Sequence, residues 1–259
     1  MWKTCEYAVD EVRKSLLAVA LALMAQDIDV WRADYERELL EPDGWLSLVG
    51  LHWLEPGQPN SGILEGATFT LEGRDVIVRR NSQERVLGSV LLHVGTRSYQ
   101  AIERGGRFAI RVRDSEAPAR REFNGLRWYR ADPAWRVTAT WRPYPAKQDR
   151  MVDSVGGVRQ KMLASGVAEF SLRGQRFRLE PFDDGDQLMF VFKDETSRST
   201  SYPGGRFLYA GPARDGKLVL DFNRAENPPC AYTPYATCPL APKSNHLPVA
   251  IEAGERRYH

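Results

Sequence analysis

One helical pattern opens the folded part of the chain. Apolar side chains recur there at intervals of three or four residues, at Ile28, Trp31, Tyr35 and Leu39. Asp27 is placed to cap the start of a helix, and Pro42 is placed to end it. The spacing predicts one amphipathic helix over residues 27–40, with its apolar stripe packed on a sheet.

From residue 67 onward the hydrophobic pattern changes to a period of two. Phe108, Ile110 and Val112 alternate with Ala109, Arg111 and Arg113, and a second run alternates over residues 135–142. Pairs that end in glycine separate the apolar runs, at Glu72-Gly73, Arg173-Gly174, Asp184-Gly185 and Asp215-Gly216. Such alternation gives each strand one apolar face, and no long helical pattern lies between the strands. We therefore predict a mainly β fold, either an antiparallel barrel or a two-sheet sandwich with one N-terminal amphipathic helix.

A dense apolar segment, residues 43–54, connects the helical region to the strands. Glycines bound it, and Pro56-Gly57 closes it. Short apolar runs fit a buried strand and a compact helical turn equally well, so only the burial of this segment is predicted.

The first 26 residues are interpreted as a leader, an extension or a disordered segment, and the choice bears on localisation. Arg13 and Lys14 precede an apolar stretch at residues 16–25, which resembles a short signal-peptide core. Acidic residues in the leading region oppose that interpretation, and translation from Met24 would make residues 1–23 an extension. We favour the extension, which gives a cytoplasmic protein, with a secreted or periplasmic protein as the alternative. Residues 27–259 are expected to form a single β-rich domain.

Composition and charge exclude several classes of protein. Hydrophobic residues make up 42% of the chain, and no apolar run approaches the roughly 20 residues that cross a bilayer. The 36 basic and 34 acidic side chains leave a net charge of +2 without a basic block, so no nucleic-acid partner is implied. The sequence lacks a Gly-x-Ser-x-Gly elbow, a His-Glu-x-x-His motif and a dinucleotide-binding glycine pattern, and no cofactor is predicted.

The most distinctive chemistry lies in residues 221–240, DFNRAENPPCAYTPYATCPL. Repeated prolines forbid a regular helix or a central strand there and predict an irregular loop. Cys230 and Cys238 fit buried thiols or a disulfide, and together with His246 they form a weaker alternative as a metal site. Cys230 would act as a nucleophile only beside a base such as His52 or His246.

A polar pocket beside this loop is expected to bind a small anionic or hydroxylated molecule. The residues expected to bind it are Arg104, Arg206 and Arg224 for charge, and Asn223, Asn227 and Tyr232 for hydrogen bonds. If the protein is an enzyme, hydrolysis is the expected class of reaction, with Asp194 or Asp221 as the base and Cys230 as the less favoured nucleophile.

A second polar set lies on the strand expected around residue 110. Arg107, Arg111 and Arg113 share one face of that strand. The face either binds an anion or is solvated beside Asp114 and Glu116.

Four segments together resemble the prokaryotic domain of unknown function family 1684. They are residues 44–54, residues 104–114, residues 221–238 and Glu252-Ala253-Gly254-Glu255, and the Asn-Pro-Pro-Cys-Ala-Tyr stretch is the most specific of them. The resemblance covers nearly everything after Asp27 and implies one complete domain, but it implies no activity. The rival hypothesis is therefore a non-catalytic structural or protein-interaction domain whose proline-rich loop plugs the core.

Overall fold

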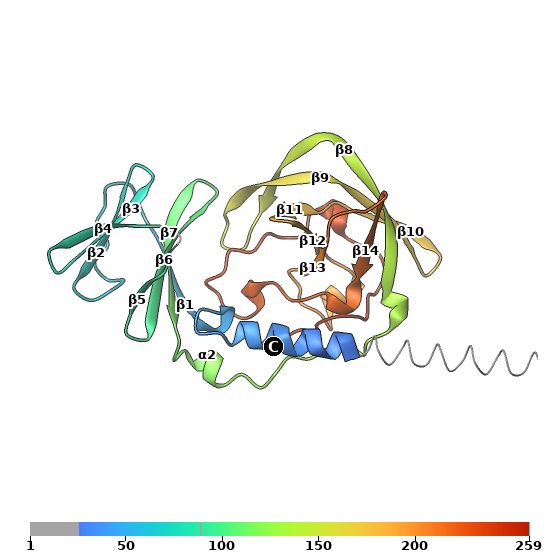
Figure 1. The fold of residues 1–259 in the computed structure, drawn as a ribbon, viewed down its shortest axis with the longest axis horizontal. Helices are drawn as coiled ribbons and strands as arrows, with labels where there is room; N and C mark the ends of the chain where they lie inside the picture. Colours follow the sequence, from blue (N-terminus) through green and yellow to red (C-terminus); the bar gives the residue numbers. More distant parts are fainter. Residues whose placement is uncertain (1–25, 89, 259) are drawn as a thin grey trace, which may run out of the picture.

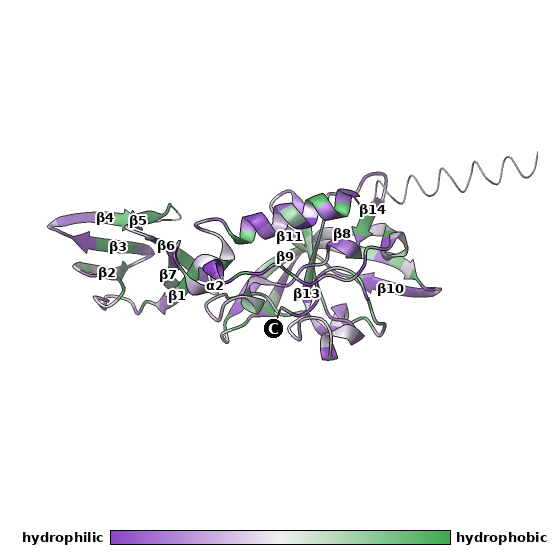
Figure 2. Cartoon of the chain, turned by 90° about the horizontal axis from the view of Figure 1, so that it is seen from below, coloured by the Kyte–Doolittle hydropathy of each residue, from purple (hydrophilic) through white to green (hydrophobic). Residues whose placement is uncertain are grey.

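The computed structural model describes residues 26–88 and 90–258 of the chain. A helix covers residues 26–39, which confirms the helix predicted from the sequence. Ile28 and Leu39 are buried on its inner face, and Figure 2 shows apolar and polar residues interspersed along it. Among the described residues, no helix has the length and apolar character needed to cross a membrane. The predictions for a leader or extension in residues 1–25 lie outside the described part of the chain.

Strands β1 to β7 form two antiparallel sheets at one end of the molecule (Figure 1). One sheet has the order β1 (Leu48–Trp53), β7 (Arg107–Asp114), β6 (Arg97–Arg104) and β5 (Leu92–Val94). The other has the order β2 (Ala67–Glu72), β3 (Asp75–Arg80) and β4 (Gln83–Leu87). Both sheets contribute to one hydrophobic core, in which Phe69 and Val78 meet Tyr99 and Ile110. This core covers the apolar face that the two-residue period of β7 predicts.

Strands β8 to β14 form a second pair of sheets beside the first, as both ribbon views show (Figures 1 and 2). One sheet has the order β10 (Gln175–Leu179), β9 (Arg159–Leu172), β8 (Arg136–Asp153) and β14 (Lys217–Asp221). The other has the order β11 (Phe182–Asp184), β12 (Gln187–Phe192) and β13 (Arg206–Ala210). The largest hydrophobic core fills the space between them, with Phe170, Phe190 and Leu220 among its buried side chains.

The mainly β fold class is confirmed, and the sandwich is the architecture that fits. The described strands pair antiparallel, and no sheet among them closes into a barrel. They form two pairs of sheets, whereas the sequence pattern predicted one pair. Residues 45–54 combine both structures considered for them, because the 3-10 turn η1 (Trp45–Ser47) leads directly into β1. That residues 27–259 are a single domain stays a prediction.

The hairpin between β6 and β7 reaches from the first pair of sheets to the second. At its turn, Gly105 has a φ of +59°, and a Cβ atom there would lie 2.2 Å from the carbonyl oxygen of Arg159 in β9. Glycine alone tolerates both the positive φ and the close approach. The contact holds Arg104 and the polar face of β7 against the second pair of sheets.

Residues 222–258 are mostly irregular, as the prolines predict, and pack against the second pair of sheets. Besides η1, the short helical elements in the described part of the chain are α2 (Pro118–Arg121), η2 (Pro133–Trp135), η3 (Glu195–Arg198), η4 (Phe222–Arg224), η5 (Pro229–Ala231) and η6 (Lys243–Asn245). The last three lie in this irregular segment. Tyr232, Ala236 and Cys238 are buried, so the loop packs inward. Gly254 has a φ of +76°, and a Cβ atom there would lie 2.3 Å from the Ala225 carbonyl oxygen. This close contact places Glu255 beneath the loop.

Candidate functional site

A cavity of about 250 Å³ lies where the two pairs of sheets meet the proline-rich loop, and we call it the central cavity. Its apolar wall includes Trp45, Met162, Met189, Phe207, Pro229 and Cys238. Its polar side chains are Tyr35, Arg104, Arg111, Gln160, Tyr209, Glu226 and Thr237. Apolar walls with a few convergent polar groups are typical of small-molecule sites.

Arg111 is a buried cation that lacks an anionic partner. Its backbone is fixed at the centre of a sheet, since β7 pairs with β1 at Leu51 and with β6 at Gln100. The side chain is 6% exposed, and its guanidinium lies 5.1 Å from the ring centre of Trp45. Within the described residues it forms no hydrogen bond or ion pair, and its Nε is enclosed without a partner. Because burial of an unpaired charge is costly, this arrangement favours an external anion.

Arg104 adds a second positive charge to the wall of the central cavity. Its Nη1 donates a hydrogen bond to the Glu103 carbonyl oxygen at 2.7 Å, and burial lowers the pKa of Arg104. Burial also lowers the pKa of Arg111, to about 10, and the positive charges of Arg104 and Arg113 add to this effect. At neutral pH Arg111 remains protonated, because a pKa of about 10 is well above 7. Two neighbouring guanidinium groups therefore make the cavity attractive to a carboxylate or phosphate.

Thr237 supplies a second buried polar group without a partner. Its side chain is 5% exposed, and its Oγ1 has no hydrogen-bond partner in the described part of the chain. Its main chain is held in place, because Gln160 Nε2 donates to the Thr237 carbonyl oxygen at 3.0 Å and to Ser154 Oγ at 2.6 Å. Of the nine buried side-chain nitrogen and oxygen atoms without a hydrogen-bond partner among the described residues, two belong to residues that line this cavity.

Glu226 brings a carboxyl group to the same cavity. Its backbone forms two hydrogen bonds of 2.9 Å with Phe207 of β13, which fix its position. The side chain forms no hydrogen bond or ion pair with another described residue. Burial and the nearby carboxyl groups of Glu255 and Glu38 raise the pKa of Glu226 well above its ordinary value. The shift favours the protonated form, which can donate a hydrogen bond or a proton to a bound molecule.

A fully buried carboxyl group, that of Glu255, lies behind the loop. It accepts hydrogen bonds from the Asn227 amide nitrogen at 2.7 Å, from Asn227 Nδ2 at 2.6 Å and from the Tyr232 hydroxyl at 2.7 Å. Burial raises the pKa of Glu255 to about 7, although these donors favour the charged form. The hydroxyls of Tyr232 and Tyr35 lie 3.1 Å apart, and Tyr35 lines the central cavity. Hydrogen bonds thus connect the buried carboxyl group to the cavity wall.

A larger cleft of about 970 Å³, which we call the outer cleft, adjoins the central cavity. The two share Tyr35, Trp45, Tyr209 and Glu226. Besides Glu226, the acidic lining residues of the outer cleft are Asp34, Glu38, Asp43, Asp184 and Asp186. Among its described lining residues, Arg224 is the one basic side chain. The cleft is therefore acidic where the central cavity is basic.

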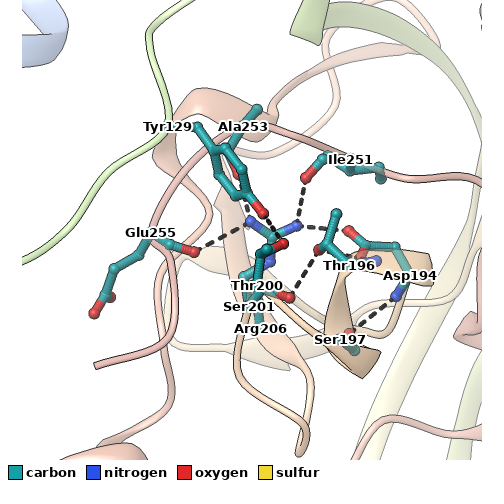
Figure 3. Close-up of polar contacts among 10 residues, drawn as sticks. All are labelled: Tyr129, Asp194, Thr196, Ser197, Thr200, Ser201, Arg206, Ile251, Ala253 and Glu255. Atoms are coloured by element: carbon teal, nitrogen blue, oxygen red, sulfur yellow. Dashed lines mark hydrogen bonds and ion pairs between the residues drawn. The ribbon is translucent and has the colours of Figure 1, made fainter. Parts of the chain in front are cut away.

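Arg206 and Asp194, predicted to supply charge and a base, form a buried ion pair away from the central cavity (Figure 3). Arg206 Nη2 donates to Asp194 Oδ2 at 2.6 Å and to the Ile251 carbonyl oxygen at 2.9 Å. Its Nη1 donates to the carbonyl oxygens of Ala253 and Glu255. Figure 3 shows the Glu255 carboxyl group pointing away from this network. These contacts fasten the C-terminal segment to β13.

Asp221 and Asn223, also predicted as site residues, make contacts within the protein. Asn223 Nδ2 donates to Asp221 Oδ1 and to the Asp132 carbonyl oxygen, both at 2.9 Å, and Asn223 Oδ1 accepts from the Asp132 amide at 3.0 Å. Arg224 lines the outer cleft, where its Nη2 lies 2.5 Å from Asp27 Oδ2. Asp221 and Asn223 therefore join the end of β14 to the segment before β8.

Cys230 and Cys238 lie next to each other as free thiols. The Cys230 amide donates to Cys238 Sγ at 3.2 Å, and the contact with Cys230 together with burial raises the pKa of Cys238. His246 is exposed, with its Nε2 3.3 Å from the Ala241 carbonyl oxygen. No group of three His, Cys, Asp or Glu side chains within residues 26–88 and 90–258 is arranged to hold a metal ion. The metal alternative of Cys230, Cys238 and His246 thus gains no support.

The predicted ligand-binding residues divide between cavity and interior. Arg104 lines the central cavity and Arg224 the outer cleft, whereas Arg206, Asn223, Asn227 and Tyr232 have partners inside the protein. The solvated interpretation of the arginine face is wrong for Arg111 and Arg113, which are 6% and 8% exposed. Sequence reasoning misses Glu226 and Thr237, although both lie in the loop that it singled out. These two residues stand out because their side chains lack hydrogen-bond partners within the protein, and no sequence motif indicates which loop side chains lack such partners.

Comparison with known proteins finds a family model that matches the second half of the chain. A family model described as "Protein of unknown function (DUF1684)" matches residues 121–256, a later start than the resemblance from Asp27 onward suggested. An uncharacterized protein of Haloarcula marismortui, solved by solution NMR, is similar with 35% identity and a TM-score of 0.45, over 54% of this chain and 80% of that one. No protein with a curated description matches. Glu226 and Thr237 lie inside the matched region, and Arg104 and Arg111 lie before it.

Proposed function

This chain belongs to the DUF1684 family of proteins of unknown function, and we propose that it binds a small anionic molecule in the central cavity. The observation that carries the proposal is Arg111, a buried guanidinium without an anionic partner. A carboxylate or phosphate between Arg111 and Arg104 would offset the cost of burying their charges. Thr237 Oγ1 and the protonated carboxyl group of Glu226 would add hydrogen bonds.

The fixed geometry around the cavity supports binding over a purely structural role. Arg111 lies on a central strand, Thr237 is held through Gln160, and the Glu226 backbone is paired with β13. Because the main chain at these residues is fixed before the ligand arrives, binding costs little backbone conformational entropy. A loop that served only to plug the core would be expected to satisfy its own buried polar groups.

The test is isothermal titration calorimetry with a panel of small carboxylates and phosphate monoesters. Arg111→Met removes the charge and keeps a side chain of similar length, while Arg107→Met makes the same change on the same strand face at an exposed position. We expect compounds that bind the wild type to lose at least about tenfold in affinity in Arg111→Met, as loss of a charge-assisted hydrogen bond implies, and to bind Arg107→Met normally. Equal affinity for wild type and Arg111→Met would contradict the proposal.

Hydrolysis in the same cavity is a second candidate, and the raised pKa of Glu226 favours it. With the anionic part of an ester held by Arg111, protonated Glu226 would donate its proton to the leaving oxygen. The attacking water would supply the oxygen of the new acid and return a proton to Glu226. Acid release from anionic alkyl esters, followed by pH-stat titration, tests this function, because an alkoxide leaves poorly unless it is protonated. Glu226→Gln should abolish turnover and retain binding, and unchanged turnover in that variant would exclude Glu226 as the acid.

A further inference from the structure

We infer that the preferred ligand is dipolar, with an ammonium group in the outer cleft and its carboxylate or phosphate in the central cavity. This inference rests on the proposed function, because it specifies what else the ligand of that cavity carries. The central cavity supplies positive charge through Arg104 and Arg111. The adjoining outer cleft supplies negative charge, and the two spaces share four lining residues. A ligand that extends from one space to the other therefore meets both signs of charge.

The outer cleft keeps several carboxylates available for a cation. Asp34 is paired with Arg37 at 2.7 Å, and Asp43 accepts a hydrogen bond from Ser98 at 2.6 Å. Glu38, Asp184 and Asp186, in contrast, are exposed, and their side chains form no hydrogen bond or ion pair with another described residue. Three carboxylates without partners would attract an ammonium group and repel a simple anion.

Aromatic side chains around the cleft also suit an ammonium group. Tyr35, Trp45 and Tyr209 lie where the cleft and the central cavity adjoin. Trp45 already carries the Arg111 guanidinium over its ring at 5.1 Å, so one of the three rings takes part in a cation–π contact. Aromatic faces bind ammonium groups through the ring quadrupole, and this attraction strengthens where water is excluded. A monopolar anion would gain nothing from these rings or from the carboxylates.

Three series of unbranched compounds test the inference: ω-amino carboxylates, alkanoates and α,ω-dicarboxylates of four to eight carbons. Their affinities would be measured by ligand-observed NMR titration at low ionic strength. The length series locates the optimal separation between the two charges. We expect the best amino acid to bind about tenfold more tightly than the alkanoate of equal length, the factor that two partly exposed ion pairs supply together. The dicarboxylates should bind more weakly than either.

The variants separate failure of this inference from failure of the proposed function. A Glu38→Gln/Asp184→Asn/Asp186→Asn triple variant should remove the advantage of the amino acid and leave alkanoate binding intact or improved. Glu65→Gln, an exposed carboxylate outside both spaces, serves as the matched control and should change nothing. If amino acids and alkanoates bind equally and both require Arg111, the ligand is a simple anion and this inference is overturned. If no compound depends on Arg111, the proposed function fails as well.

Discussion

Replacement of Arg111 by methionine is expected to stabilise the protein while it removes the anion site. Burial and neighbouring positive charges lower the pKa of Arg111 from 12.5 to about 10. At about 1.4 kcal/mol for each pH unit, this difference means that the charged form costs the empty protein about 3 kcal/mol at neutral pH. Methionine has a flexible apolar side chain that fills irregular space and brings no charge into the cavity.

The gain is reduced by the contact that arginine makes with Trp45. A cation over an aromatic ring at 5.1 Å contributes about 0.5–2 kcal/mol, so the net stabilisation by Arg111→Met is about 1–3 kcal/mol. For a chain of this size, each kcal/mol raises Tm by about 2–4 °C. Arg107, on the same face of β7 and 4.4 Å from the ring centre of Trp53, is exposed, so Arg107→Met should lower stability by about 0.5–1 kcal/mol at most.

Urea unfolding of wild type, Arg111→Met and Arg107→Met provides the measurement. A higher midpoint at unchanged m value is expected for Arg111→Met. Residues retained for binding often lower stability in this way. A loss of more than about 1 kcal/mol in Arg111→Met, larger than the loss in Arg107→Met, would show that Arg111 supports the fold, and the reasoning from its missing partner would be refuted.

Three further predictions concern the network around the site. Because its folded-state pKa of about 7 exceeds its ordinary 4.5, Glu255 stabilises the fold fully below pH 4.5 and loses that contribution as pH rises through 7. Over that window wild type should therefore lose about 3 kcal/mol more unfolding free energy than Glu255→Gln, in which the raised pKa of Glu226 still contributes. Parallel slopes of the two proteins in urea titrations would disprove this. Asp194→Asn leaves Arg206 buried with a weakened partner and should cost about 3–5 kcal/mol; a cost under about 1 kcal/mol would contradict the importance of the ion pair. Gly105→Ala should lower both Tm and anion affinity, because its Cβ would lie 2.2 Å from the backbone oxygen of Arg159 in β9. Gly106→Ala, with open space around it, should lower Tm alone. Equal anion affinities in the two variants would contradict the claim that the contact between the β6–β7 hairpin and β9 positions the anion site.

The fold could be predicted from the sequence where local pattern determines the structure. The spacing of Ile28 and Leu39 predicted the helix, and alternation around Ile110 predicted a strand with one apolar face. Turn pairs such as Asp184-Gly185 marked real connections between strands. These features depend on near neighbours in the chain, so a single sequence records them. The division of the strands into two pairs of sheets depends on long-range packing, which local pattern does not specify.

The site was less predictable, because its chemistry depends on which buried polar side chains have a partner inside the protein and which do not. Arg206 of β13 and Arg111 of β7 are the same residue type on strands with buried apolar neighbours, yet one is paired with Asp194 and the other has no partner. Asn227 attracted attention as part of the proline-rich loop, and it serves to bind Glu255 inside the protein. Glu226, its neighbour, points to the cavity. Residue type alone does not distinguish these cases.

The most direct test of the central claim is the ¹⁵N resonance of the Arg111 Nε group during titration with the tightest-binding compound of the panel. The signal can be assigned by its absence from the spectrum of Arg111→Met. If an anion binds between Arg111 and Arg104, this resonance should shift in a saturable manner with the affinity that calorimetry gives, while the Arg206 Nε signal stays in place. Saturable binding that leaves the Arg111 resonance unmoved would show that the ligand binds elsewhere, and the assignment of the central cavity as an anion site would be wrong.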